Sequence, residues 1–409
     1  MKKHSLYMIL LLSLMIMGIS CEDYTTSIDP LIDRVEDERL TAESQINFVI
    51  NGVHTRFATT YCRTCVLVGL LSDEMYFDPN VPNATFPSFA DIDVGEIILD
   101  NNSVDGVFNG IGELRFFSDD LIRRIGEITF SDQTLQDKGL FWSNFYGGVA
   151  RYLYATYFGL NENEGGGIID NGPFIPSADM YDLAVEKFNT ALENTDDTYQ
   201  VRMVHSCLAR LYLFQSDYAN AATHANQGME NGDDPFQSLH SVQSDNYFWQ
   251  QAGVGRTQCV VPQRFKDYTI ADPNELTRVK LDSIFGNNEV WFYRQGKYLI
   301  EASPINFVSW QENELMLAEC ALQGQATAGD ALTRINAVRN YHGLDPLNTA
   351  DMTVLMEERD KELCWIGVRL PDQRRWDAQY QTWHLGADKW HYLPITERER
   401  NINPNLPDV

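Results

Sequence analysis

The sequence predicts a mostly α-helical protein in which tetratricopeptide-repeat-like helix pairs form a right-handed superhelical scaffold. The clearest evidence is three consecutive amphipathic patterns between Phe174 and Glu230, in which apolar residues recur every three or four positions. Ala184 and Ala221 stand at equivalent places 37 residues apart, close to the period of about 34 of such repeats. A single copy would favour an ordinary helical bundle, whereas two copies in tandem favour the repeat.

The elements expected along the chain divide it into regular and irregular parts. A helical pattern runs over Thr41–Asp73, and repeat-like helices are expected at about 140–230 and 312–366. Residues 74–120 and 231–311 have little helical periodicity and gather proline and glycine, so we expect irregular, loop-rich regions there. Residues 41–409 are predicted to form a single domain.

The N-terminus predicts export and lipidation. Lys2 and Lys3 precede an apolar run of secretory-signal length that ends at Ile19. Small residues then lead directly into Cys21, as in the lipobox of bacterial lipoproteins, so residues 1–20 are predicted to be a lipoprotein signal peptide and Cys21 the lipidated residue. An ordinary signal peptide followed by a chance cysteine is the alternative. Residues 21–40 are predicted to form an acidic tether.

Composition excludes several classes of partner. The 409 residues carry a formal net charge of −27, and so acidic a surface repels nucleic acids and anionic lipid headgroups.

Cys62 and Cys65 form a CxxC, but no second CxxC or histidine pair with metal-ligand spacing accompanies it. We therefore expect core thiols or a local disulfide there, no metal site and no cofactor.

Aromatic clusters in the irregular regions are the candidate ligand-binding residues. Flat aromatic rings stack on the C–H faces of sugars, and core packing is the alternative role for each cluster. The candidates are Tyr76, Phe77, Tyr247, Phe248, Trp249, Trp291 and Tyr293.

Enzyme motifs are missing from the sequence. It contains no HExxH pattern and no nucleophile elbow. A pair of catalytic carboxylates cannot be singled out among 58 acidic residues. Binding without catalysis is the favoured interpretation.

Several blocks, taken in order, resemble the SusD/RagB family of outer-membrane nutrient-binding lipoproteins of Bacteroidetes. After the lipobox come FIPSADMYDLAVEKFNTAL, ELMLAECALQG and EERDKELCWIGVRLPDQRRW, closed by YLPI and NPN. Two features depart from the family pattern: Cys364-Trp365-Ile366 and Pro371. The chain is also shorter than a typical member, with the deficit in residues 231–311, which leaves the ligand class open. Within the C-terminal block, Arg359, Glu362, Arg369 and Arg374 are expected to form a structural ion-pair network.

The resemblance implies a SusD-like fold and a function. Such proteins are lipid-anchored in the outer membrane, facing the cell exterior, and hold an oligomeric nutrient for a SusC-like TonB-dependent transporter. A glycan is the expected ligand and a peptide the alternative. Two further alternatives are a surface-exposed glycan-degrading enzyme and a purely structural repeat lipoprotein.

Overall fold

Helices packed side by side dominate the structure, a computed structural model that describes residues 40–407. The predicted signal peptide, the lipidation of Cys21 and the tether up to residue 39 lie outside the described residues. The main helices are α2 (Ile46–Leu71), α3 (Pro87–Asp93), α4 (Asn102–Glu127), α5 (Gln133–Tyr157), α6 (Ser177–Leu192), α7 (Thr198–Phe214), α8 (Tyr218–Ala225), α9 (Tyr247–Ala252), α10 (Gln263–Ala271), α11 (Trp310–Leu322), α12 (Ala331–Tyr341), α13 (Met352–Glu362), α14 (Arg369–Tyr380) and α15 (Glu397–Ile402). The predicted mostly α-helical class is confirmed.

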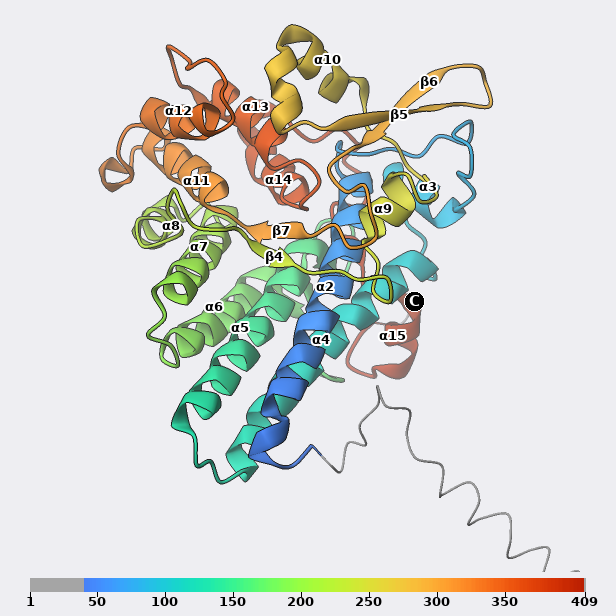
Figure 1. Ribbon diagram of the computed structural model, residues 1–409. Coiled ribbons are helices and arrows are strands. Elements are labelled where there is room, and N and C mark those ends of the chain that lie inside the picture. The colour runs from blue at the N-terminus through green and yellow to red at the C-terminus, as the bar shows by residue number, and fades with distance from the viewer. Residues whose placement is uncertain (1–39, 408–409) are drawn as a thin grey trace, which may run out of the picture.

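Successive helix pairs stack into one wall (Figure 1). The pairs are α5 with α6, α7 with α8, and α11 with α12, and α8 also contacts α11. Ala209, Ala221 and Ala222 are fully buried in the cluster where α7 and α8 meet Met316 and Cys320 of α11. Because alanine side chains are short, the helices approach closely there. The helix pairs expected from the repeat pattern are therefore present, and the later pair continues the wall after a long excursion of the chain.

Polar residues start many of these helices. The side chains of Asn101, Asp132, Asp197, Asp217 and Ser309 accept hydrogen bonds from backbone N–H groups in the first turns of α4, α5, α7, α8 and α11. Such caps satisfy donors that have no partner within the helix. The short polar stretches between the apolar patterns therefore fix where the helices begin.

The expectation that residues 74–120 are irregular was wrong for residues 87–93, which form α3, and for residues 102–120, which belong to α4. The glycines that suggested a loop face the neighbouring helix or the solvent instead. Thr60 of α2 donates through Oγ1 to the carbonyl of Gly110 at 3.1 Å, so a side chain at position 110 would collide with Thr60. The glycines thus allow α2 and α4 to approach closely rather than ending the helix.

Short strands tie distant parts of the chain together. In the described part, β1 (Phe158–Gly159) pairs in parallel with β8 (Leu393–Pro394), and β4 (Phe236–Ser238) pairs antiparallel with β7 (Ile305–Val308). Two-residue strands β2 (Gly166–Gly167) and β3 (Ile175–Pro176) also pair. The hairpin of β5 (Leu281–Phe285) and β6 (Trp291–Gln295) projects from the body beside α3 and α10 (Figure 1).

The core contains the cysteine thiols. All six cysteines of the described chain are free and buried, and Cys62 and Cys65 lie on the buried side of α2. Burial raises the pKa of the Cys62 thiol to about 12, which keeps it protonated at neutral pH. The CxxC is thus a pair of core thiols rather than a local disulfide. No helix in the described range is apolar enough over sufficient length to cross a membrane.

Candidate functional site

A groove runs along the outer surface of α2 and α4. It consists of two adjoining cavities of about 340 and 520 Å³ that share Arg63 and Gly106 as lining residues. α9 and the segment before α3 close one end, where Tyr247 and Phe86 line the smaller cavity. Phe48 and Phe117 stand at the other end, in the larger cavity. Below, this feature is called the α2–α4 groove.

Glycines keep the groove open. A Cβ atom added to Gly52 on α2 or Gly106 on α4 would meet no other atom within 4 Å, so these two positions leave open space where other residues would place a side chain. Gly110, deeper in the crossing, is closed off by Thr60. The same residue type therefore serves two purposes, close helix packing at one position and an open surface at the others.

Aromatic rings at the smaller cavity are held by their neighbours. Asn246 caps α9 by accepting from the backbone N–H groups of Phe248 and Trp249, which fixes Tyr247 at the first turn. The ring of Phe89 lies edge-on to Tyr247 at 6.5 Å and to Phe86 at 5.4 Å. Burial raises the pKa of Tyr247 to about 12, so its phenol stays neutral. The two rings form a preorganised apolar platform.

Each platform ring also carries a guanidinium group. The Cζ atom of Arg63 lies 5.5 Å from the ring centroid of Tyr247, and that of Arg256 lies 4.7 Å from the centroid of Phe86. Both distances are within the range of cation–π attraction. The stacks restrain two long side chains whose outer edges stay open to a ligand.

Hydroxyl and amide groups supply the remaining polarity of the groove. Ser88 and Ser103 contact each other through their Oγ atoms at 2.8 Å beside the smaller cavity. Thr55, Thr59 and Gln243 line the larger one. Such neutral groups donate and accept hydrogen bonds without a charge, which is the chemistry that recognises hydroxyl-rich ligands. The described lining contains no Asp, Glu, His or Cys, so it offers no ordinary general acid or base.

The predicted aromatic residues lie in three different places. Tyr247 lines the groove, and Trp249 is half-buried one residue beyond the buried Phe248 of the same helix. Phe248 packs in the core against Tyr298, with ring centroids 5.1 Å apart. The structure therefore brings only part of this cluster to the α2–α4 groove.

The N-terminal candidates support the loop they belong to. Tyr76 forms a β-bridge with Val260 and packs against a small apolar cluster that contains Val81 and Phe292. The backbone N–H of Phe77 donates to Asp93 at 3.1 Å. Both side chains are half-buried, and neither lines the groove.

The hairpin candidates form a separate exposed patch. Trp291 is 60% exposed on β6, and its ring meets that of Phe285 on β5 at 5.1 Å. Tyr293, two residues further along the strand, is half-buried beneath Lys266. This patch belongs to the β5–β6 hairpin, which projects from the body (Figure 1), and none of its residues lines the groove.

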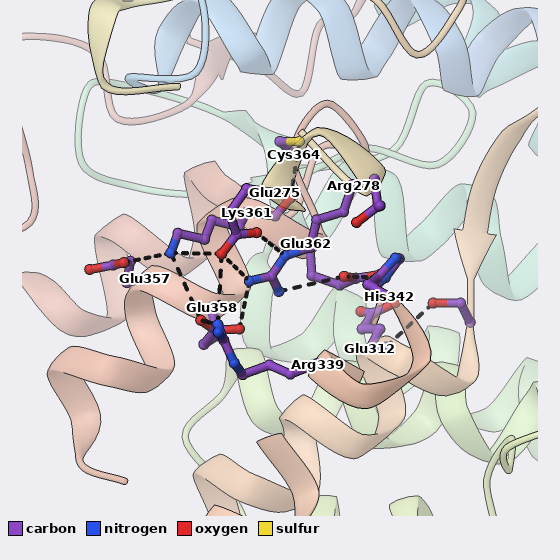
Figure 2. Close-up of polar contacts among 12 residues, drawn as sticks. Glu275, Arg278, Glu312, Arg339, His342, Glu357, Glu358, Lys361, Glu362 and Cys364 are labelled. Atoms are coloured by element: carbon purple, nitrogen blue, oxygen red, sulfur yellow. Dashed lines mark hydrogen bonds and ion pairs between the residues drawn. The ribbon is translucent and has the colours of Figure 1, made fainter. Parts of the chain in front are cut away.

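A buried ionic cluster anchors the irregular excursion to the C-terminal helices. Figure 2 shows Glu275, Arg278 and Lys361 converging with Glu358 and Arg339. Arg278 pairs with Glu275 at 2.6 Å and with Glu358 at 2.8 Å, and Lys361 pairs with Glu275 at 3.1 Å. Because one member comes from the 3-10 turn Pro273–Thr277 and others from α12 and α13, the cluster fixes the excursion in place.

Three of the four residues expected to form an ion-pair network have charged partners, in separate clusters. Arg359 pairs with Asp372 at 2.8 Å, and Arg369 pairs with Asp73 at 2.7 Å. Glu362 pairs with Arg278 at 3.7 Å and contacts the imidazole of His342 at 2.9 Å. Burial alone would raise the pKa of Glu362, but His342 and the neighbouring cations outweigh it and lower that pKa.

Arg374, the fourth residue, forms hydrogen bonds to backbone carbonyl groups. Among the described residues it has no carboxylate partner and donates instead to the backbone carbonyls of His391 and Thr156, at 2.8 and 2.5 Å. Its guanidinium lies 4.1 Å from the ring centroid of Tyr392. It therefore anchors the C-terminal segment to α5 through hydrogen bonds rather than through ion pairs.

Sequence reasoning missed the polar stripe of α2. Phe48, Gly52, Thr55, Thr59 and Arg63 recur at intervals of three and four along this helix, whose other positions are largely buried. Such spacing places these residues on one face of the helix. A mostly polar stripe on an otherwise apolar helix is the sequence signal that could have identified the groove.

A polar cleft of about 490 Å³ lies beside the ionic cluster. Lys297, Tyr341, His342 and Asp234 are among its lining residues. Trp310, which also borders it, is only 2% exposed. The cleft thus mixes both signs of charge and lacks an accessible pair of platform rings. No group of three or more His, Cys, Asp or Glu residues in the described chain is arranged to hold a metal ion.

Known proteins share part of this sequence pattern and most of this fold. Residues 314–407 match the model of the SusD family. A crystal structure of a SusD superfamily protein from Bacteroides vulgatus ATCC 8482 has a TM-score of 0.68 at 15% identity and covers 90% of this chain and 99% of its own. No curated protein matches the sequence.

The names of two further similar structures state what those proteins bind. A laminarin-binding SusD-like protein has a TM-score of 0.67 at 13% identity, over 87% of this chain and 96% of its own. Surface glycan-binding protein A from Bacteroides thetaiotaomicron has a TM-score of 0.66 at 13% identity, over 90% and 98%. The resemblance predicted from the sequence is confirmed: the C-terminal part has the family's sequence pattern, and most of the chain shares its fold.

Proposed function

From a SusD-family sequence pattern in the C-terminal helices and a SusD-like fold over most of the chain, we propose that this protein is a carbohydrate-binding protein of the cell surface. It holds an oligosaccharide in the α2–α4 groove. The observation that carries the proposal is the platform of Tyr247 and Phe86 in an open groove lined with hydroxyl and amide groups. Similar proteins named for binding laminarin or surface glycans support the ligand class.

The shape of the groove suits an oligomer. Its lining residues on α2 extend from Phe48 to Leu67, which corresponds to roughly 28 Å at a rise of 1.5 Å per residue. Rings at both ends offer apolar faces to sugar C–H groups. The threonine, serine and glutamine side chains between them can exchange hydrogen bonds with sugar hydroxyls. A monosaccharide would leave most of this surface empty.

The lining favours binding without turnover. Glycoside hydrolysis uses two carboxyl groups that flank the bond to be cleaved, and the described lining of the groove has none. A peptide ligand is the alternative within the same type of protein. The glycan is favoured because the platform combines flat rings with neutral hydroxyl groups.

We further propose that the protein is anchored in the outer membrane through Cys21, faces the cell exterior and delivers its ligand to a SusC-like TonB-dependent transporter. The lipobox before Cys21 and the resemblance to the SusD/RagB family support this. Co-purification from outer membranes tests the partnership. A protein recovered without a barrel partner, or without acyl groups on Cys21, would contradict it.

The binding proposal is tested by titrating purified protein with a panel of oligosaccharides in a calorimeter. Replacing Tyr247 with alanine removes the central platform ring, so we expect its affinity to fall at least tenfold, which corresponds to about 1.4 kcal/mol. Tyr341→Ala is the matched control because Tyr341 is an exposed tyrosine outside the groove. Its affinity should equal that of the wild type.

The hairpin patch is the competing location. If Trp291→Ala abolishes binding while Tyr247→Ala does not, the ligand binds at the hairpin and the groove assignment is wrong. Release of shorter sugars during the titration would instead indicate a degradative enzyme. Binding of peptides alone would favour the peptide alternative, and no binding of either class would leave a structural repeat protein.

A further inference from the structure

The charge of the α2–α4 groove is opposite to that of the chain. Of the 409 residues, 58 are Asp or Glu and the formal net charge is −27. The described lining of the two cavities nevertheless contains no acidic residue, and it includes Arg56 and Arg63. The other two cavities described here are both bordered by carboxylates, Asp233 and Glu362 in one and Glu113 and Asp170 in the other. Among the four cavities described here, the two without acidic lining residues are therefore the two that form this groove.

Arg63 has no carboxylate partner among the described residues. Within the described chain its guanidinium forms no ion pair and no hydrogen bond that would occupy its N–H groups, and it stacks on Tyr247. The charge of Asp245, two residues before Tyr247, acts on the phenol of that ring, but no ion pair joins Asp245 to Arg63 among the described residues. A stacked guanidinium keeps its hydrogen-bonding edge free.

Arg256 repeats the arrangement on the neighbouring ring. It stacks on Phe86, and one Nη2 hydrogen bond of 3.0 Å goes to the neutral Oγ1 of Thr85. The loop below it is fixed because Gln258 Oε1 accepts from the backbone N–H groups of Thr85 and Phe86, at 2.8 and 3.1 Å. Two guanidinium groups therefore flank the platform.

These two arginines are exceptional in this protein. Among the described residues, the other arginines without a carboxylate partner are Arg374 and Arg400, and both donate to backbone carbonyls. Arg56, at the far end of the groove, is partly neutralised by Glu113 at 2.8 Å. Among the described arginines, those with neither a carboxylate nor a backbone carbonyl as partner are therefore the two at the aromatic platform.

We propose that the oligosaccharide bound in this groove is anionic and carries carboxylate or sulfate groups that Arg63 and Arg256 recognise. The inference rests on the proposed carbohydrate-binding function and specifies its ligand class. Guanidinium groups bind carboxylates and sulfated groups through paired N–H donors. The ring surface that the guanidinium groups leave uncovered contacts the sugar, and the free guanidinium edges bind the charged groups. The overall negative charge of the protein makes this local positive charge necessary for binding an anion.

Paired probes that differ only in charge test the inference. Oligogalacturonate is compared with its neutral methyl ester for the carboxylate, and sulfated chondroitin oligosaccharide with its desulfated form for the sulfate. We expect at least one charged probe to bind at least tenfold more tightly than its partner. Raising the salt concentration should weaken that preference, because exposed charges are screened.

Arginine variants locate the preference. Arg63→Gln and Arg256→Gln should each reduce affinity for the charged probe at least fivefold more than they reduce affinity for its neutral partner. Arg123→Gln is the matched control, because Arg123 is an exposed arginine of α4 that lines neither cavity and stacks on neither platform ring. It should bind the charged probe like the wild type. Equal loss in Arg123→Gln would overturn the assignment to the two stacked arginines.

The remaining outcomes separate this inference from the function on which it rests. Tight binding of neutral oligosaccharides that is lost in Tyr247→Ala, with no preference for charge, overturns the anionic ligand and leaves the carbohydrate-binding function intact. If folded protein binds no oligosaccharide of either charge, the proposed function fails and the inference fails with it.

Discussion

Glu74 is a buried carboxyl group that supports an unusual backbone conformation. Its Oε1 atom accepts from the backbone N–H of Trp365 at 3.0 Å, and Trp365 has a left-handed φ of 63°. Large side chains rarely adopt that conformation. Glu74 therefore helps hold the Trp365 turn that departs from the family pattern.

Burial raises the pKa of Glu74 from 4.5 to about 8. Between these two values the folded protein keeps a proton that the unfolded chain releases, so this group's contribution to stability is complete below pH 4.5 and is lost as the pH rises through 8. In the Glu74→Gln variant, the free energy of unfolding should fall less between pH 5 and pH 8 than in the wild type. The difference should be up to about 1.4 kcal/mol per pH unit.

Urea unfolding at pH 5, 6.5 and 8 measures this slope. Glu186→Gln serves as the control because Glu186 is exposed on α6, and its slope should match the wild type. Identical slopes in Glu74→Gln and the wild type would show that Glu74 does not titrate in this range.

The sequence predicted Tyr247 as a candidate ligand-binding residue, but it did not show which of the adjacent aromatic residues would be buried. Tyr247 was expected at a ligand site and lines the groove, whereas Phe248, the next residue, is fully buried. On β6, Trp291 is 60% exposed and Phe292 6%, because successive side chains of a strand point to opposite faces. A cluster of adjacent aromatics therefore divides between surface and core, and only the geometry shows which ring goes where.

At the scale of elements, α2 and α4 determine the groove. Gly106 lines both cavities and has open space where a side chain would lie. Gly106→Ala should raise the free energy of unfolding by about 0.5–1 kcal/mol, because alanine loses less conformational entropy in a helix than glycine. Gly106→Leu should instead fill the groove and weaken oligosaccharide binding at least tenfold.

Gly126 provides the matched control for these substitutions. It lies on the same helix with no atom within 4 Å of an added Cβ and lines neither cavity. Gly126→Leu should bind like the wild type in calorimetric titration. Full binding by Gly106→Leu would mean that the ligand does not occupy the point where the two cavities meet.

The sequence predicted helices best where their apolar period was uninterrupted. The helix pairs of the wall follow that pattern, whereas α14 was not predicted and α4 was predicted only at its C-terminal end, around Leu121–Ile128. In α14, Pro371 lies in the first turn, where proline removes no hydrogen bond of the helix. Glycine misled the prediction in α4, where tertiary packing made it acceptable.

At the scale of the whole molecule, one buried ion pair joins the two parts of the helical wall. Arg210 of α7 and Glu312 of α11 are 1% and 0% exposed in their side chains and pair at 2.5 Å. Arg210 also donates to the carbonyl of Phe307 in β7. The repeat pattern predicted both helix pairs, but nothing in the local sequence indicated that these residues, 102 positions apart, would meet.

Breaking this pair should destabilise the entire fold. Arg210→Met leaves the Glu312 carboxylate buried without its partner, so we expect the free energy of unfolding to fall by about 3–5 kcal/mol. The Arg210→Met/Glu312→Leu double variant should recover most of that loss, because no uncompensated charge remains. Chemical denaturation of the three proteins measures the coupling.

The pair of Arg334 with Glu314 on α11, at 3.1 Å, is the control because Arg334 is 28% exposed. Arg334→Met should cost about 1 kcal/mol or less, as partly exposed ion pairs contribute little. A loss in Arg210→Met no larger than that in Arg334→Met would contradict the linking role.

The buried thiols of the described chain act as built-in reporters of local opening. They lie on α2, α7, α11 and two connecting segments, at Cys62, Cys65, Cys207, Cys259, Cys320 and Cys364. A thiol-specific reagent can modify each of them only while its part of the structure is open, since reaction requires both access and the thiolate form. The order in which peptides acquire the label therefore maps which helices separate first, and it does so without any engineered residue.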